Sequence, residues 1–451
     1  MQAFRDVLDQ CGFVDLGYSG PDFTWHGRRR GELIWETLDR GVVNYDWLSR
    51  FPIGRVRHLH YYTSDHRPIL LSLDSNGENQ WWKRKPFWFE AMWLTDLERS
   101  GVISTAWACN AEGSPMVMVT KKVAKCKKML KAWNRDRFGN VLQKIKRTKE
   151  LLWRAKEEAV RSRNDGEVRS LKQELAELYA KEEKMWHQRS LLQWLQCGDQ
   201  NTKFFHGSAT QRKRRNFIKG LKDAKGAWHE DEDHISSMFT AYIVELFMSS
   251  NPHDLDRVLD GVQNVVTDDM RADLAKPYLM EKVEFAIKEI APLKAPGLDG
   301  MPPLFYQTYW SEVGMDISQA VLSSLNSGSL LKSINHTFIT IIPKVQNPER
   351  VNDFKPTSLC NVIYKIVSKV ITNRLKPLLN SIISEAQSAF TADRLITDNI
   401  LIAFESVHHM KNTCTRNKGF MALKLDMSKA YDRVEWLFLE KILLRMGFQE
   451  S

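Results

Sequence analysis

Residues 419–434 constrain the fold of this chain most strongly, because they combine a strand pattern with a carboxylate at its end. Residues 420–427 are apolar-rich, and an alternation of period two places four side chains on one face: Met421, Leu423, Leu425 and Met427. Asp426 lies on the opposite face, at the end of the predicted strand. A carboxylate there can bind a divalent cation, although aspartate between a strand and a helix is more often a turn or cap residue.

A helix is predicted directly after this strand. Asp432 stands three residues before Glu435, which is the spacing of a helix N-cap and its reciprocal partner. An apolar stripe at helical spacing follows, formed by Val434, Leu437, Phe438, Ile442 and Leu443. The stretch therefore predicts a half-buried strand that runs into an amphipathic helix.

The composition indicates a folded protein with a polyanionic partner. Of its 451 residues, 43% are hydrophobic, and the formal net charge is +10. Such a chain can bury cores in about two or three domains, and its charge favours nucleic acid or an acidic membrane surface. No apolar run approaches the length of a membrane span and no secretory signal opens the chain. We therefore expect an intracellular protein, nuclear or cytoplasmic, with no membrane partner.

The six cysteines are scattered and include no Cys-x-x-Cys pair and no Cys/His cluster of zinc spacing. We predict free thiols and no zinc site.

The first 75 residues mix short strands and turns. Strands are predicted from Phe23 and over Leu33–Leu38, and Ser64-Asp65-His66 precedes an apolar run. The simplest interpretation of Ser-Asp-His is a loop with a satisfied histidine. A carboxylate–histidine pair also has a chemical use: Asp39 would orient and polarise His66 at a scissile phosphate, while Asp65 steers a water or a metal-bound hydroxide.

Residues 76–280 are predicted to be mainly helical and basic. A polar linker over 74–80 leads into an aromatic-basic stretch, 81–89, for which packed rings are favoured over base stacking. The segment 121–149 is rich in cations, which favours phosphate contact over a solvated helix face, and includes Lys121, Lys122, Lys125 and Lys128. Residues 141–196 predict a helical hairpin broken near Asn164-Asp165-Gly166, with an intermolecular coiled coil as the second arrangement.

A second basic cluster follows at Arg212-Lys213-Arg214-Arg215. It is interpreted as a nuclear-import signal or a nucleic-acid patch, with a short basic loop as the common alternative.

Residues 281–418 alternate helices with turn-rich loops. Helices are predicted around 283–290, 313–325 and 363–375, and a strand over 337–342. Lys294-Ala295-Pro296-Gly297-Leu298-Asp299-Gly300 is rich in turn residues and is predicted to be an ordered loop. His408-His409 is predicted to lie on a helix surface and not to bind a metal.

Several of these motifs resemble the reverse transcriptases of LINE-type (non-LTR) retrotransposons, in the form common in plants. Leu-Asp-Met-Ser-Lys-Ala-Tyr-Asp-Arg-Val at 425–434 resembles their first catalytic motif, and 294–300 a loop just before the fingers. Ile342-Pro343-Lys344 and the segment 354–359 resemble motifs of the fingers. Residues 387–399 resemble the motif that follows them in the family. Residues 194–206 match the spacer between endonuclease and polymerase in plant members.

The resemblance implies roles for individual residues. Asp426 would be a metal ligand of a two-metal polymerase site using Mg²⁺ or Mn²⁺. Tyr431 would be the gate against the ribose 2′-hydroxyl, and Asp432 a structural cap. Lys344 and Lys355 would contact the incoming deoxynucleoside triphosphate, and Arg394 nucleic acid. The family has Arg where this chain has Lys355, and a lysine does not reproduce the planar fork of arginine.

The N-terminal segment is similar to the C-terminal end of apurinic-type endonucleases fused to LINE polymerases. The shared order is Ser-Gly-Pro-Asp-Phe-Thr-Trp, Leu38-Asp39-Arg40 and Ser64-Asp65-His66. One departure is Thr37, where the family usually has Arg. The family's other metal-binding residues would precede residue 1, so we expect the nuclease to be inactive.

The resulting prediction is an α+β chain in three parts. Residues 1–75 would be the end of an endonuclease/exonuclease/phosphatase-type α/β sandwich, 76–280 a helical basic spacer, and 281–451 the fingers and first palm strand of a right-hand reverse transcriptase. Its function would be RNA-directed DNA polymerisation by target-primed reverse transcription, with an RNA template and target DNA as partners. Because the second carboxylate pair of the family would lie beyond residue 451, we expect a truncated, inactive fragment. The alternatives are a nucleic-acid-binding remnant and a pseudogene product without a selected function.

Overall fold

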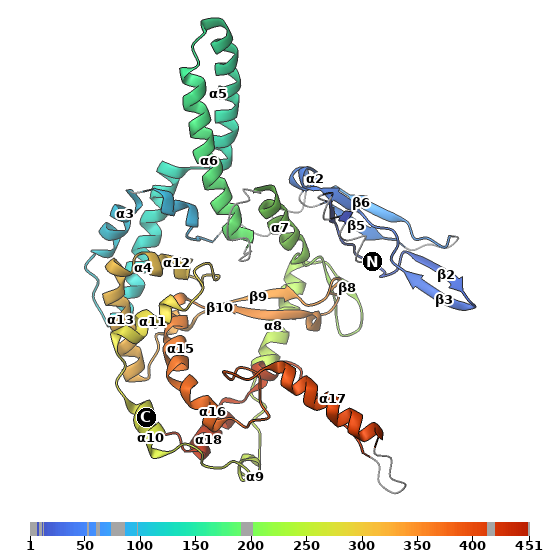
Figure 1. Cartoon of the computed structure of the whole chain (residues 1–451), viewed down its shortest axis with the longest axis vertical. Helices are drawn as coiled ribbons and strands as arrows, with labels where there is room; N and C mark the ends of the chain where they lie inside the picture. The colour runs from blue at the N-terminus through green and yellow to red at the C-terminus, as the bar shows by residue number, and fades with distance from the viewer. Residues whose placement is uncertain are drawn as a thin grey trace.

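The computed structural model describes residues 7–8, 11, 13–51, 54–59, 64–73, 86–96, 98–190, 202–412 and 420–449. The predictions for the linker, the start of the aromatic-basic stretch and most of the spacer motif lie outside these residues. Figure 1 shows a helical body, a helical hairpin that projects from it, and N-terminal strand pairs to one side of α7 (Thr202–Arg215). The chain is thus a mixed helix and strand protein.

The N-terminal strands form separate antiparallel pairs. β1 (Phe13–Asp15) pairs with β4 (Val42–Asn44), β2 (Trp25–Arg29) with β3 (Glu32–Glu36), and β5 (Arg55–His58) with β6 (Ile69–Ser72). α2 (Tyr45–Arg50) begins after Asn44, whose Oδ1 accepts a hydrogen bond from Trp47 N at 2.9 Å. Strands form where they were expected near 23 and 33, but within the described residues they do not join into larger sheets. The sandwich therefore stays a prediction.

The largest core unites helices from both sides of the boundary predicted at residue 280. α3 (Glu98–Trp107) and α4 (Pro115–Trp133) pack with α11 (Met280–Lys288), α12 (Pro303–Thr308), α13 (Trp310–Ser327) and α15 (Val362–Leu375). Val123, Ile287, Ile317 and Ile366 are buried in it. Trp107 Nε1 and Lys122 Nζ both donate to Asp316 Oδ2, at 2.7 and 2.6 Å. The three helices predicted in 283–375 are confirmed, and their apolar faces share one core with the preceding segment.

The helical hairpin predicted within 141–196 is confirmed. α5 (Val141–Ser162) and α6 (Gly166–Ser190) run antiparallel and project from the body (Figure 1). Asn140 caps α5 by accepting from Leu142 N and Gln143 N at 3.1 and 3.3 Å. A satellite core of Leu152, Ala155 and Val168 lies between the two helices. Two short turns connect this region to the body: η1 (Ala91–Thr95) and the π-helical turn η2 (Asn134–Phe138).

A second core holds a β-hairpin against α8 (Glu232–Phe247). The hairpin consists of β9 (Phe338–Pro343) and β10 (Phe354–Leu359), which pair antiparallel with Phe354 opposite Pro343. Phe354 is buried against Leu221, Ile235 and Phe239. The short pair β7 (Leu221–Lys222) and β8 (Trp228–His229) completes this unit, and α14 (Lys332–Asn335) and η3 (Val351–Asp353) flank the hairpin. The strand predicted over 337–342 is confirmed, whereas β10 was not predicted.

The loop 294–300 is ordered, as predicted. A Cβ on Gly297 would lie 2.4 Å from Asn361 Oδ1, so only glycine lets the loop approach Asn361 this closely. Gly300 has a φ of +76°, and its carbonyl oxygen accepts a hydrogen bond from Phe89 N at 3.0 Å. The loop therefore binds the start of the helical segment to α15.

The C-terminal part lies more openly on the body. α15 leads through η4 (Lys376–Leu378) and α16 (Leu379–Ile382) to α17 (Ile396–Asn412), which extends away from the body in Figure 1. η5 (Ala430–Arg433) and α18 (Trp436–Met446) follow. α18 contacts α9 (Leu255–Leu259), and α10 (Asp268–Ala275) precedes α11. His408 and His409 are exposed on α17, as predicted.

Two predictions at this end are wrong. Residues 420–427 form no strand, because their backbone pairs with no other segment among the described residues and an isolated strand leaves its N–H and C=O groups unsatisfied. Their apolar side chains are exposed, with Met421 at 86%. Asp432 is not an N-cap, because it lies inside η5. Glu435 occupies the cap position of α18, but its side chain makes no hydrogen bond to that helix.

Within the described ranges, no helix combines the length and the apolarity that crossing a bilayer requires. Cys11, Cys109, Cys126 and Cys360 are free thiols, as predicted.

Candidate functional site

Asp426 lies in the extended segment that leads into η5, and its side chain is exposed. The segment is fixed at its C-terminal side by Glu435, whose carboxylate accepts from Ser249 Oγ at 2.7 Å and from Ser250 N and Oγ at 2.8 Å. These hydrogen bonds, first that of Ser249, lower the pKa of Glu435. Glu435 thus anchors the motif to the end of α8 instead of capping its own helix.

Lys429 adds a second anchor to α8. Its φ of +53° is in the left-handed region, and its ammonium lies 4.6 Å from the centre of the Tyr242 ring. A cation over an aromatic face is attracted by the negative face of the ring. The backbone turn at Lys429 therefore places η5, with Tyr431, beside α8.

Tyr431 meets the motif at 387–390. Its ring contacts the ring of Phe390 edge to face, with 5.8 Å between centroids. Both side chains remain largely exposed, Tyr431 at 77%. The structure thus brings together two motifs that are about forty residues apart in sequence. Asp393, in the same motif, has a φ of +62°, a conformation that glycine adopts more readily.

Lys344 and Lys355 lie on one face of the β9–β10 hairpin. Because Phe354 opposes Pro343, Lys355 opposes Ile342, and Lys344 is its diagonal neighbour on the face opposite Phe354. Both lysines are exposed, and Lys344 Nζ donates to Asn352 O at 3.2 Å. The hairpin therefore presents two cations on its open face while its other face packs on α8.

The carboxylates near Asp426 do not make a complete metal site. Two divalent ions at a polymerase centre need several oxygen ligands, and the described residues contain no group of three or more His, Cys, Asp or Glu side chains that could hold one ion. Asp426 offers a single carboxylate, so the residues present do not fit the implied Mg²⁺ pair.

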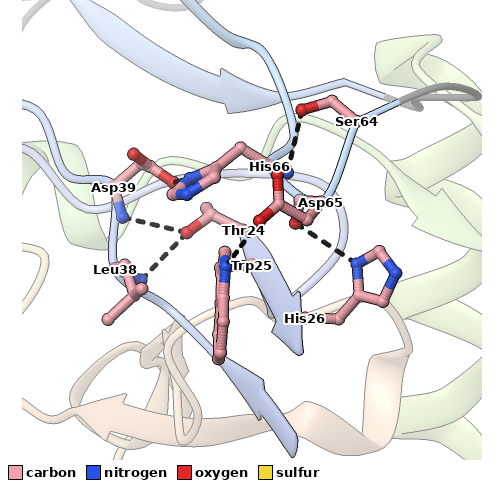
Figure 2. Close-up of polar contacts among 8 residues, drawn as sticks. All are labelled: Thr24, Trp25, His26, Leu38, Asp39, Ser64, Asp65 and His66. Atoms are coloured by element: carbon pink, nitrogen blue, oxygen red, sulfur yellow. Dashed lines mark hydrogen bonds and ion pairs between the residues drawn. The ribbon is translucent and has the colours of Figure 1, made fainter. Parts of the chain in front are cut away.

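The N-terminal segment holds a second candidate site, drawn in Figure 2. His66 Nδ1 and Asp39 Oδ2 are 2.8 Å apart, as the sequence predicted for an orienting pair. Asp65 turns away from this pair: its Oδ2 accepts from Trp25 Nε1 at 3.1 Å, and its backbone oxygen accepts from His26 N at 3.0 Å. Both His66 and Asp39 remain partly exposed. The imidazole can therefore reach a ligand from solvent.

Thr24 positions this site, and the sequence pattern did not single it out. Its side chain is fully buried, and its Oγ1 accepts hydrogen bonds from Leu38 N and Asp39 N, both at 2.9 Å (Figure 2). Its backbone oxygen accepts from Arg67 N at 2.7 Å. Thr24 therefore ties the Asp39 loop to the His66 loop. No linear spacing relates these positions, so only the fold could reveal the role.

The electrostatics of the pair favour a charged histidine. The hydrogen bond to Asp39 is the main cause that raises the pKa of His66. For Asp39, partial burial acts to raise the pKa, but the hydrogen bonds with His66 and Thr24 outweigh it, and the pKa is lowered. The two shifts agree, because each charged form stabilises the other.

The basic residues predicted to contact nucleic acid divide into two groups. Lys121, Lys125 and Lys128 are exposed on α4, and Lys121 Nζ donates to Glu112 O at 2.8 Å. Lys122 instead pairs with Asp316 across the main core. The structure therefore corrects the prediction for Lys122, because its ammonium already has a carboxylate partner and is half-buried.

Arg214 and Arg394 also bond to the protein itself. Arg214 donates to Gly54 O and, at 3.5 Å, to Leu16 O, while Arg212, Lys213 and Arg215 are exposed. Arg394 donates to backbone carbonyls near the end of α16, including Gln387 O at 2.7 Å and Ile383 O at 3.2 Å. Both guanidiniums hold backbone segments together, and their contact with nucleic acid stays a prediction.

Comparison with known proteins identifies the C-terminal part. Residues 342–451 match the sequence model of the family described as reverse transcriptase (RNA-dependent DNA polymerase). The chain is also similar to the "Transposon TX1 uncharacterized 149 kDa protein" of Xenopus laevis, with 28% identity over 262 residues. That similarity covers 58% of this chain and 20% of the relative, so it spans about a fifth of that protein's length.

Proposed function

We propose that this chain, which carries a reverse transcriptase domain from residue 342 onward, belongs to the RNA-directed DNA polymerase of a non-LTR retrotransposon. The match of 342–451 to the reverse transcriptase family is the observation that carries the proposal. The similarity to a transposon protein supports the class of element. RNA template, target DNA and deoxynucleoside triphosphates are the partners that this function implies, and the plant LINE subclass rests on the motif resemblance alone.

In this proposal the β9–β10 hairpin and the Asp426 segment have different roles. Lys344 and Lys355 on the open face of the hairpin bind the triphosphate oxygens. The Tyr431 ring, held against Phe390, limits the space at the sugar. Asp426 would supply one carboxylate ligand to a metal ion, which does not by itself complete a site. Because the other ligands are not assembled among the described residues, we derive no chemical step through the metal.

Nucleotide crosslinking tests the binding half of this proposal. An azido-substituted deoxynucleoside triphosphate should label the peptide that contains residues 344–355, and the variant K344Q/K355Q should lose most of the label. Lys332→Gln is the matched control, because Lys332 is also an exposed lysine of this region but lies on α14. Equal labelling of the hairpin variant and the control would reject the proposed nucleotide site.

Primer extension on an RNA template tests the catalytic half. With Asp426 as the single assembled carboxylate, we expect no incorporation by the 451-residue chain above that of Asp426→Asn. Incorporation that Asp426→Asn abolishes would overturn the expectation of inactivity and would establish the polymerase directly.

The Asp39–His66 pair favours a second function in the N-terminal segment. We propose that residues 13–73 are the end of an endonuclease-type domain in which His66 contacts a phosphodiester. The 2.8 Å contact supports this, because the hydrogen bond with Asp39 orients the ring and raises the pKa of His66. NMR titration with a short DNA duplex should raise the pKa of His66 further in the wild type and to a lesser degree in Asp39→Asn. A His66 signal that does not respond to DNA would reject phosphate contact.

A further inference from the structure

A cleft of about 610 Å³ lies where three distant parts of the chain meet. Its walls come from the N-terminal strand pairs around 15–20 and 55–57, from the end of α7 and the β7–β8 unit at 211–230, and from the β9–β10 connection at 346–349. Figure 1 shows these elements side by side, with α7 between β5 and the body. The volume falls in the range of ligand-binding clefts, roughly 300–1,000 Å³.

The lining carries an excess of positive charge. Six cationic and three acidic side chains line it; the cations are Arg55, Arg57, Arg214, Arg215, Lys219 and Lys222. Each acidic side chain already has another partner. Asp15 pairs with Arg40 at 3.0 Å, and Glu349 pairs with Lys222. Glu230 lies 3.7 Å from Lys219 and accepts from Trp228 Nε1 at 3.0 Å. With six cationic side chains against three carboxylates, the lining has a net attraction for anions.

Two of the arginines that line the cleft, Arg214 and Arg55, are near enough to influence each other electrostatically. Arg214 reaches from α7 to the carbonyl oxygens of Gly54 and Leu16, and it is half-buried. Burial first, and then the charge of Arg55, lower the pKa of Arg214. Holding two like charges side by side costs free energy, which an anion between them would offset. Arg57 and Arg215 extend the cationic surface and are exposed.

Aromatic rings line the same cleft. The Trp228 indole packs over Gly220, where an added Cβ would lie 2.6 Å from the ring, and 44% of Trp228 remains exposed. The Arg55 guanidinium lies 3.9 Å from the centre of the Phe217 ring, so a cation and a ring form one stacked surface. Arginines next to exposed rings are the combination that proteins use to bind single-stranded nucleic acids, with phosphates on the cations and bases on the rings.

We propose that this cleft binds a single-stranded nucleic-acid segment, with its phosphates at Arg55, Arg57, Arg214 and Arg215 and a base on Trp228. The site is separate from Asp426 and from the Asp39–His66 pair, because none of these residues lines the cleft. A strand bound there would lie between the N-terminal segment and the reverse transcriptase domain. The choice of nucleic acid as the polymer rests on the proposed function, whereas the anion-binding cleft rests on the geometry alone.

Fluorescence anisotropy with a labelled oligonucleotide of about 12 nucleotides tests the proposal on the complete chain. The variant R57Q/R215Q removes two exposed guanidiniums that make no hydrogen bond within the described part of the chain, so its fold should be retained. The matched control is R161Q/R169Q, which removes two exposed guanidiniums near the far end of the α5–α6 hairpin. Trp228→Ala tests the stacking surface.

For the cleft variant, we expect the slope of the logarithm of the binding constant against the logarithm of the salt concentration to become shallower by about 1 for each phosphate that is no longer neutralised. The control should leave this slope unchanged. Trp228→Ala should weaken binding about fivefold or more. An oligonucleotide carrying iodouracil should crosslink to the peptide that contains Trp228. Equal binding by the cleft variant and the control would overturn the proposal.

Further experiments distinguish nucleic-acid binding in the cleft from acidic-peptide binding and from the proposed function. Displacement of the oligonucleotide by polyglutamate of equal charge, at the same concentration, would assign the cleft to acidic peptides and overturn the nucleic-acid claim. Asp426→Asn should leave oligonucleotide binding unchanged, because Asp426 lies outside the cleft. A wild-type chain that is not labelled by the nucleotide at 344–355 would reject the proposed nucleotide site and leave the cleft result standing. A wild-type chain that is labelled there but does not bind the oligonucleotide would do the reverse.

Discussion

At the scale of single residues, Asp299 is the clearest case in which burial sets a chemical property. Its Oδ1 accepts from Met301 N at 3.1 Å, and its Oδ2 lies 3.4 Å from the Tyr306 hydroxyl. Burial is the main cause that raises the pKa of Asp299 from 3.8 to about 6. The carboxylate therefore holds the 294–300 loop in place while the fold disfavours its charge.

This raised pKa predicts a stability that falls as the pH rises. Between pH 3.8 and about 6 the folded state retains a proton that the unfolded state has released, so the free energy of unfolding decreases across that window. The full difference corresponds to about 3 kcal/mol. Because part of Asp299 remains exposed, we expect a smaller change, on the order of 1–2 kcal/mol.

Urea unfolding between pH 4 and 7 measures this effect. Asp299→Asn should keep the bond from Met301 N, remove the decrease across the window, and unfold at higher urea than the wild type at pH 7. Asp136→Asn, at an exposed aspartate, is the control and should leave the pH dependence as it is. An unchanged slope in Asp299→Asn would assign the pH dependence to other groups.

At the scale of elements, the β9–β10 hairpin depends on one side chain. Phe354 is 1% exposed, and its ring meets the Phe239 ring edge to face at 5.2 Å between centroids. Phe354→Ala should cost about 3–5 kcal/mol, because it leaves a cavity between the hairpin and α8. Phe338→Ala, on the same hairpin but 48% exposed, should cost much less.

Hydrogen exchange followed by mass spectrometry tests whether Phe354 holds the β9–β10 hairpin in place. Amides of residues 338–359 should exchange faster in Phe354→Ala, while those of the α5–α6 hairpin should keep their wild-type rates. If Phe354→Ala and Phe338→Ala exchange alike, the second core does not hold the hairpin.

The elements also show what the sequence could and could not predict. α5, α6, α13 and α15 carry their own apolar periodicity, so their existence followed from local pattern. The segment 420–427 has an equally clear period of two, but a strand needs a partner, and sequence alone does not say whether one is present. β10 was missed because Pro356 and three polar residues mask its pattern.

Sequence pattern also predicted only part of the candidate sites. The Asp39–His66 pair was predictable from the resemblance to endonucleases in which Leu-Asp-Arg and Ser-Asp-His lie together, and the structure contains this contact. Thr24, the partners of Arg394 and the cleft around Arg214 were not predictable. Each depends on backbone atoms or on segments far apart in the chain, which leave no periodic signal in the sequence.

At the scale of the whole molecule, the main core crosses the domain boundary that the motif resemblance predicted at residue 280. α4 and α13 bury Val123 and Ile317 in the same cluster, and Asp316 on α13 accepts hydrogen bonds from Trp107 and Lys122. A core with no internal division should unfold as one unit, because loosening either helix exposes the apolar face of the other. The segments 98–133 and 280–375 are thus predicted to share one stability.

Ile317→Ala distinguishes one cooperative unit from two. Ile317 is fully buried, so its truncation should cost about 2–5 kcal/mol and should speed hydrogen exchange in α4 by the same factor as in α13. Leu152→Ala, in the satellite core of the projecting hairpin, is the control and should change exchange in α5 and α6 alone. Two independent domains would instead leave α4 protected while α13 opens. Equal acceleration would mean that the helical segment before residue 280 is a structural part of the same core as α11, α13 and α15.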